Sequence, residues 1–231
     1  YEMLLDQIYQ NESELNPSIT TAYKNAKKAI RKAIFKDKIE GESVFCWYPK
    51  NTQITNFFSS ITNTRSQKVI SDIRTSWNIY CEHVKGGSNQ LRANYMKKNF
   101  EGYLKKYGRN EKVFIKLGGV HLTRGLSPFK VNDVGNYLVD LANKNGKEFL
   151  SIRHLITYRN GKSNVGKSAW KSVDLFLKLG IKEQWTLVDL RPFRALLEKG
   201  KISTNEQIAY ELKSYDLLLI SPDDQYPKIN Y

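Results

Sequence analysis

The feature that most constrains the fold is a regular alternation of short apolar runs and helical stripes in the second half of the chain. Apolar runs with the length of strands occur at 113–117, 149–158, 185–190 and 217–220. Segments with apolar residues at helical spacing separate these runs, and strands that alternate with helices favour a parallel or mixed sheet. The sequence therefore predicts an α/β fold with a central, mostly parallel sheet flanked by helices.

The first part of the chain carries more helical patterns. Residues 16–38 have an apolar stripe at helical spacing, with basic side chains over much of the remaining surface. The run SVFCWYP at 43–49 predicts a short strand. Further helical segments are expected at 52–61, 72–84 and 89–107. We expect a helical N-terminal segment at 1–42 and an α/β domain at 43–231, the latter being part of a larger domain.

The chain is strongly basic. Lys and Arg together number 37 and Asp and Glu 23, which gives a formal net charge of +14. Such a charge is typical of proteins that bind nucleic acid or another polyanion. Acidic residues are interspersed, however, and Lys, Asn, Ile and Tyr are all abundant, as in proteins from AT-rich genomes. We favour this compositional interpretation, and a basic binding module for a polyanion remains an alternative function.

The two cysteines and the hydropathy bear on the compartment. Cys46 and Cys81 form neither a disulfide framework nor a CxxC metal pair, so we expect two buried free thiols. No apolar run approaches the roughly 18 residues of a membrane span. No secretory signal is visible, although a segment before Tyr1 could carry one. We therefore expect a soluble protein, cytoplasmic rather than secreted.

The strongest candidate for a functional site is KVFIKLGGVHLTRG at 112–125. The run from Val113 to Leu117 has the composition of a buried strand, and Gly118 and Gly119 allow a sharp turn and close approach of a ligand. In open α/β sheets, ligands bind beyond the carboxyl ends of the strands. His121 there can act as a general acid or base, or bind a metal. A hydrogen-bonded structural role is the alternative.

Five other residues complete the predicted site. Arg92 and Asn99 are seven residues apart and lie on one side of a helix, although Arg92 could instead form a surface ion pair. We expect Arg92 and Arg124 to bind an anion or oxyanion, and Asp189 to orient its neighbours. Asn99 and Arg191 are expected to bind substrate. No set of metal ligands stands out, and nothing in the sequence requires a cofactor.

The order of these motifs resembles the C-terminal part of the erythromycin esterase-like proteins, which share a superfamily with the haem-uptake ChaN proteins and the Tiki proteases. The resemblance covers about residues 88–222 and rests on LRANYMKKN (91–99), the segment at 112–125, WTLVDLRPFRALLEKG (185–200) and YDLLLISPDD (215–224). It implies hydrolysis of an ester bond in a small-molecule or acyl substrate, with a histidine at a strand end that activates water. It also implies that Arg92 opens into the same cleft as His121.

The chain departs from that family in three respects. Ala93 stands where the esterases usually carry Asp, and Gly118-Gly119 replaces a His-Asn pair. The Gly-Glu-x-His motif of the family's first strand is missing. We therefore expect this motif upstream of Tyr1, or a chain that is not catalytic by itself.

A second motif, GKSNVGKS at 161–168, matches the P-loop consensus. In a P-loop, Lys167 would reach the terminal phosphates and Ser168 would hold magnesium, so a nucleotide hydrolase is a second alternative. The preceding residues 158–160 are polar, and too few strands follow for a P-loop core. We expect a mobile basic loop without specific nucleotide binding.

Overall fold

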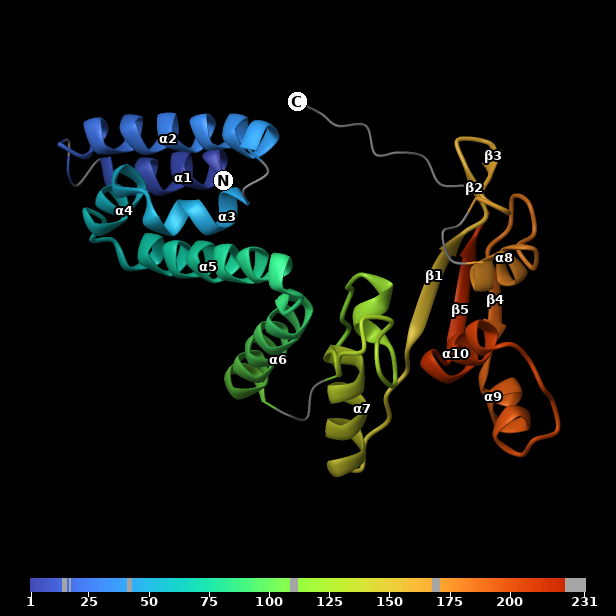
Figure 1. Cartoon of the computed structure of the whole chain (residues 1–231). Coiled ribbons are helices and arrows are strands. Elements are labelled where there is room, and N and C mark those ends of the chain that lie inside the picture. Colours follow the sequence, from blue (N-terminus) through green and yellow to red (C-terminus); the bar gives the residue numbers. More distant parts are fainter. Residues whose placement is uncertain (14–15, 17, 41–42, 109–111, 168–170, 223–231) are drawn as a thin grey trace. The chain divides into compact units, whose positions relative to one another are not determined.

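The chain divides into two compact units, Tyr1–Arg92 and Ala93–Tyr231, and helix α6 (Ser88–Tyr107) crosses from one to the other. The computed structural model describes residues 1–13, 16, 18–40, 43–108, 112–167 and 171–222 (Figure 1). The boundary expected after residue 42 stays a prediction, and α2 before it packs on α4 after it.

The described residues of the first unit form helices joined by short loops, and a buried cluster around Trp77, Tyr48 and Phe57 forms its core. Its elements are α1 (Glu2–Ser13), α2 (Ile19–Glu40), α3 (Val44–Trp47), the 3₁₀ helix η1 (Tyr48–Lys50), α4 (Thr52–Ser59), α5 (Thr64–Cys81) and the 3₁₀ helix η2 (Glu82–Lys85). These bounds confirm the helices expected from apolar periodicity in this region.

The strand expected at 43–49 is wrong, because α3 and η1 occupy this segment. Val44 and Tyr48 are four residues apart and both are buried, so they lie on one helical face. A short apolar run does not distinguish a strand from a buried helical turn, and here packing against α5 decides.

The buried carboxylate of Glu12 links the end of α1 to the loop between α4 and α5. Glu12 at the end of α1 accepts hydrogen bonds from the Thr62 and Asn63 backbone N–H groups, at 2.8 and 3.0 Å, and from the Thr62 hydroxyl at 2.5 Å. Burial by itself would raise the pKa of Glu12, but these hydrogen bonds lower it. Asn63 in turn caps α5 through a bond from the Ser66 N–H.

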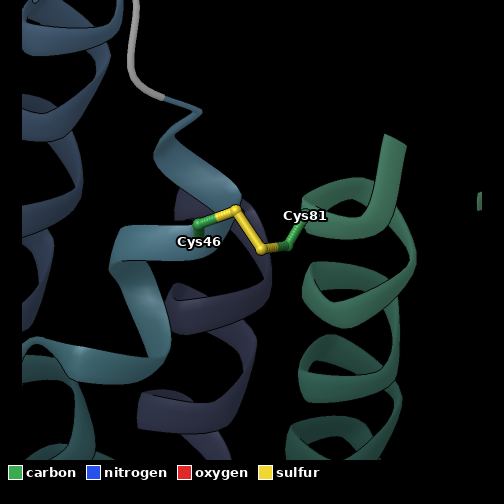
Figure 2. The surroundings of a disulfide bond; sticks show 2 residues. All are labelled: Cys46 and Cys81. Atoms are coloured by element: carbon green, nitrogen blue, oxygen red, sulfur yellow. A yellow bond between two sulfur atoms is a disulfide. The ribbon is translucent and has the colours of Figure 1, made fainter. Parts of the chain in front are cut away.

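The two cysteines form a disulfide, which Figure 2 shows between α3 and the end of α5. Cys46 and Cys81 are 35 residues apart in sequence, and their Cα atoms are 4.8 Å apart. Both side chains are half-buried. The expectation of two buried free thiols is therefore wrong, because helix packing brings together two residues whose sequence positions do not indicate a pair.

The second unit combines helices with a small sheet, so the α/β class is confirmed. After α6 it contains the 3₁₀ helix η3 (Gly119–Leu122), α7 (Val134–Lys144), β1 (Ile152–Ile156), β2 (Tyr158–Arg159), β3 (Lys162–Ser163), α8 (Lys171–Leu177), β4 (Thr186–Asp189), α9 (Arg191–Glu198), α10 (Glu206–Ser214) and β5 (Leu217–Ser221). The expected strands at 149–158, 185–190 and 217–220 contain β1, β4 and most of β5, whereas the β2–β3 hairpin was not expected.

The three-stranded sheet is mixed rather than mostly parallel. Its strand order is β1-β5-β4, with β1 parallel and β4 antiparallel to the central β5 (Figure 1). Leu155, Leu218 and Ile220 point to the face that packs with the helices, in one cluster with Phe176 of α8 and Leu212 of α10. The sheet therefore has a single well-covered face among the described residues.

Residues 113–117 do not form the buried strand that their composition predicts. Phe114 is 88% exposed and Val113 39% exposed, and no backbone hydrogen bond to another described residue involves this segment. A strand needs a neighbour with which to pair, and apolar composition alone does not supply one. His121 consequently lies in η3 and not at the carboxyl end of a strand.

Candidate active site

A histidine–aspartate pair forms the centre of the candidate site. The Nδ1 atom of His121 lies 2.7 Å from Oδ2 of Asp133, and the Asp133 side chain is almost fully buried. The other carboxylate oxygen, Oδ1, accepts the Val134 N–H at 2.7 Å and so caps the first turn of α7. Asp133 is thus held from one side by the helix and contacts the imidazole from the other.

A glycine in the first turn of α7 makes this pair possible. A Cβ atom at Gly135 would lie 2.3 Å from the carbonyl carbon of Leu122 and 2.4 Å from the carbonyl oxygen of Thr123. Such distances are far inside van der Waals contact, so only glycine lets η3 pack this closely on α7. The packing brings His121 within reach of Asp133.

The contact with Asp133 determines how the imidazole can react. A carboxylate can only accept a hydrogen bond, so Nδ1 of neutral His121 carries the proton and donates it. The Nε2 atom then keeps its lone pair, and no hydrogen bond to another described residue occupies it. The His121 side chain is mostly buried, with 14% of its surface exposed. The pair has the arrangement of a general base and the group that orients it.

A second buried carboxylate, Asp216, anchors the region beside η3. It accepts hydrogen bonds from Arg124 at 2.8 Å, Arg194 at 2.6 Å and the Ser151 N–H at 2.8 Å. The Arg124 guanidinium also lies over the ring of Phe149. Arg124 is therefore engaged in an ion pair, and its predicted role as an oxyanion binder stays a prediction.

Two further bonds hold η3 at the amino ends of β1 and β5. The Ser151 hydroxyl donates to the Leu122 carbonyl at 2.7 Å, and the Tyr215 hydroxyl donates to the Gly119 carbonyl at 3.0 Å. Burial raises the pKa of Tyr215, so this hydroxyl stays protonated over a wide pH range. The expectation that His121 follows the carboxyl end of a strand is wrong, because residues 113–117 form no strand. These contacts hold η3 at the edge of the sheet where β1 and β5 begin and the antiparallel β4 ends.

The predicted residues at the end of β4 form a local pair. Arg191 donates two hydrogen bonds to the Asp189 carboxylate, from Nε at 2.9 Å and from Nη2 at 2.8 Å. These bonds lower the pKa of Asp189 to about 2. Both side chains are largely exposed, and within the described residues neither forms a hydrogen bond or ion pair with His121. Their predicted roles in orienting groups and in binding substrate stay predictions.

The two predicted residues on α6 fall in different units. Arg92 belongs to the first unit, where its guanidinium lies 5.3 Å from the ring centroid of Tyr80. Asn99 belongs to the second unit and lines a groove. The expected common cleft of Arg92 and His121 stays a prediction.

The groove beside Asn99 has a volume of about 480 Å³ and is called the α6 groove below. Its walls are Met96, Asn99, Phe100 and Tyr103 of α6, the segment 112–117, and Val134. Contacts with α7 and the loop before it hold α6 in place. The Phe100 and Tyr137 rings meet edge to face at 6.5 Å, the Tyr137 hydroxyl donates to Glu101, and Lys97 donates to the Asn132 carbonyl.

The stretch that matches the P-loop consensus has a different backbone. Asn160 and Gly161 have φ angles of 49° and 71° and form the turn of the β2–β3 hairpin. The Gly166 N–H, which would bind phosphate in a P-loop, donates to the Asp174 carboxylate at 3.0 Å. Ser168 lies outside the described residues. Nucleotide binding stays untested, but residues 161–167 do not form a phosphate cradle.

Sequence reasoning missed Asp133, Gly135 and Asp216. Asp133 carries a visible signal, because an Asp immediately before an apolar helical stripe is a preferred N-cap. Gly135 inside a predicted helix was a sign of close backbone approach. The partners of Asp216 are 22 to 92 residues away, and nothing local indicates them.

Comparisons of the chain with protein-family models, with curated proteins and with solved structures found no match. Within the part of the chain that the structure describes, no three His, Cys, Asp or Glu side chains gather where they could hold a metal ion. In the same residues, no helix has both the length and the apolar character needed to cross a bilayer.

Proposed function

We propose that the second unit carries the site of a hydrolase that cleaves an ester-type bond, with His121 as the general base. The observation that carries this proposal is the 2.7 Å contact between Nδ1 of His121 and the buried Asp133 carboxylate. The resemblance of the motif order to the erythromycin esterase-like proteins supports the same chemistry. The resemblance also implies a mostly parallel central sheet, which is part of this proposal. The three described strands themselves form a mixed sheet.

The chemistry needs one water molecule and returns the base unchanged. Nε2 of His121 takes a proton from water while the water oxygen attacks the carbonyl carbon of the ester. The resulting tetrahedral oxyanion collapses, the bond to the alcohol oxygen breaks, and the imidazolium gives its proton to the leaving alkoxide. The products are a carboxylic acid and an alcohol. General base catalysis of this kind contributes about 10²- to 10⁴-fold to the rate.

The other residues have supporting roles in this proposal. Asp133 orients the imidazole and stabilises its protonated form during the reaction. Arg124 belongs to the same unit as His121 and is the candidate for stabilising the oxyanion. To bind the oxyanion, Arg124 has to break its hydrogen bond to Asp216. Arg92 stays the candidate from the first unit.

The test is an ester panel, such as p-nitrophenyl acetate and butyrate, measured on the full chain and on variants. We expect His121→Ala to lower kcat/KM by about a hundredfold or more. The matched control is His154→Ala, because His154 is exposed on β1 and stacks on Trp185 at 5.8 Å. Circular dichroism verifies that each variant is folded. Equal rates of ester hydrolysis for wild type and His121→Ala would show that His121 is a structural residue and not the base.

The disulfide supports a compartment different from the one expected from sequence. Cytosolic proteins keep their cysteines reduced through glutathione and thioredoxin, and stable disulfides are typical of oxidising environments. The Cys46–Cys81 bond therefore favours function in an oxidising compartment over the cytoplasm. Binding of a polyanion and nucleotide hydrolysis remain alternative functions without a specific observation in their favour.

A further inference from the structure

We propose that the α6 groove binds a small amphipathic anion, with an apolar body along the groove and one anionic group at its basic wall. This inference rests on the proposed hydrolase function and names its substrate class: esters whose acyl or alcohol part is such an anion. A carboxylate, a phosphate and a sulfate share the required chemistry.

The walls of the groove are mainly apolar. Apolar and aromatic side chains form most of the lining, among them Phe100, Tyr103, Phe114, Leu117 and Val134. Phe114 is 88% exposed and Tyr103 44% exposed, so a bound ligand would cover large apolar surfaces that now face solvent. A volume of about 480 Å³ suits a ligand of the size of a small organic molecule.

The charge of the groove has one sign. Lys112 and Lys116 line it, and no acidic side chain does so among the described residues. The acidic residue nearest in sequence on α6, Glu101, accepts a hydrogen bond from the Tyr137 hydroxyl. Two lysines beside a mostly apolar wall match one anionic group on an apolar body. Aromatic rings beside basic side chains also occur in sites for single-stranded nucleic acid, which the oligonucleotide competition below tests.

The lining of the groove adjoins the His121–Asp133 pair at two points of the chain. Leu117 lines the groove and is followed by the two glycines and η3, and Val134 lines it directly after Asp133. A Cβ at Gly118 would lie 3.5 Å from Cδ2 of His121, so Gly118 lies beside the imidazole. The proposal places the ester bond of a ligand held in the groove at this side of the base.

The experiment measures binding of 2-naphthoate to the full chain by isothermal titration calorimetry. This aromatic carboxylate has no ester bond, so its binding is independent of hydrolysis. The cation 2-naphthylmethylammonium serves as the matched probe of opposite charge. We expect wild type and His121→Ala to bind 2-naphthoate equally, and the cation to bind at least tenfold more weakly.

Two pairs of variants locate the site. Phe114→Ala should weaken 2-naphthoate binding about tenfold, whereas Phe193→Ala, which removes a 47% exposed ring on α9, should not. The double change Lys112→Ala with Lys116→Ala should also weaken binding. Its control is Lys105→Ala with Lys106→Ala, which removes the same charge from α6 outside the groove lining.

Three results would overturn the inference. They are no binding of 2-naphthoate, equal losses in the two lysine double variants, and displacement of 2-naphthoate by a fifteen-residue oligothymidylate at lower concentration. The last result would favour the polyanion module. If 2-naphthoate binds as expected but no ester is hydrolysed, the hydrolase proposal fails and the groove remains a ligand site. If His121-dependent hydrolysis occurs without 2-naphthoate binding, only the groove assignment fails.

Discussion

Removal of the disulfide should cost the protein a large part of the stability of its first unit. The bond joins residues 35 positions apart, and a cross-link over that separation lowers the entropy of the unfolded chain by about 13 cal/mol/K, or about 4 kcal/mol at 25 °C. Domains are typically stable by only about 5–15 kcal/mol. The double change Cys46→Ser with Cys81→Ser should therefore shift the unfolding of this unit strongly.

The assay is urea unfolding followed by circular dichroism at 222 nm, because all the regular secondary structure in the described part of the first unit is helical. Dithiothreitol should lower the urea midpoint of wild type towards that of the double variant. It should leave the double variant unchanged, which controls for other effects of the reductant.

The reasoning is refuted by coincident wild-type curves with and without reductant. It is also refuted if the unfolded, non-reduced protein titrates two free thiols per chain. Either outcome would remove the argument for an oxidising compartment as well.

Two further predictions concern the site. Gly135→Ala should lower the thermal midpoint and the esterase rate, because its Cβ would meet the Leu122 backbone at 2.3 Å; overpacking costs about 1–3 kcal/mol. Gly102→Ala on α6 meets nothing within 4 Å and should raise the midpoint slightly, so equal effects of the two changes would contradict the close approach. Burial raises the pKa of Tyr215 above its ordinary value of 10. The protonated hydroxyl therefore contributes fully to the free energy of unfolding below pH 10, and this contribution is lost as the pH rises further. The urea midpoint should thus fall less between pH 8 and 11 in Tyr215→Phe than in wild type; identical falls would refute this.

Local pattern predicted most elements of the second unit, and non-local pairing explains the failures. The strands β1, β4 and β5 and the helices between them follow from periodicity, because each depends on its own apolar residues. The direction of β4 does not follow from periodicity, because its antiparallel pairing with β5 depends on the connection through α9 and α10. The run at 113–117 is as apolar as a strand but has no neighbour to pair with among the described residues. The Cys46–Cys81 bond is non-local in the same way.

The candidate site shows the same division. His121 could be identified from its place after an apolar run and two glycines, although its environment differs from the one expected. Arg124 was expected to hold charge on a substrate, but Asp216, 92 residues away, holds the guanidinium. A sequence indicates which side chains can react, whereas the partners that already occupy them come from the folded chain.

Asp133 has two functions, and this decides how the proposed base should be tested. One oxygen caps α7 and the other orients His121, so Asp133→Ala would remove both and cost about 1 kcal/mol of helix stability. Asn is as good an N-cap as Asp, so Asp133→Asn should keep the fold. With its single oxygen on the Val134 N–H, the Asn amide would donate to Nδ1 and force the proton onto Nε2. The base would then be lost while the helix cap is retained. A rate for Asp133→Asn as low as that of His121→Ala, at an unchanged thermal midpoint, would therefore support the orienting role, and an unchanged rate would exclude it.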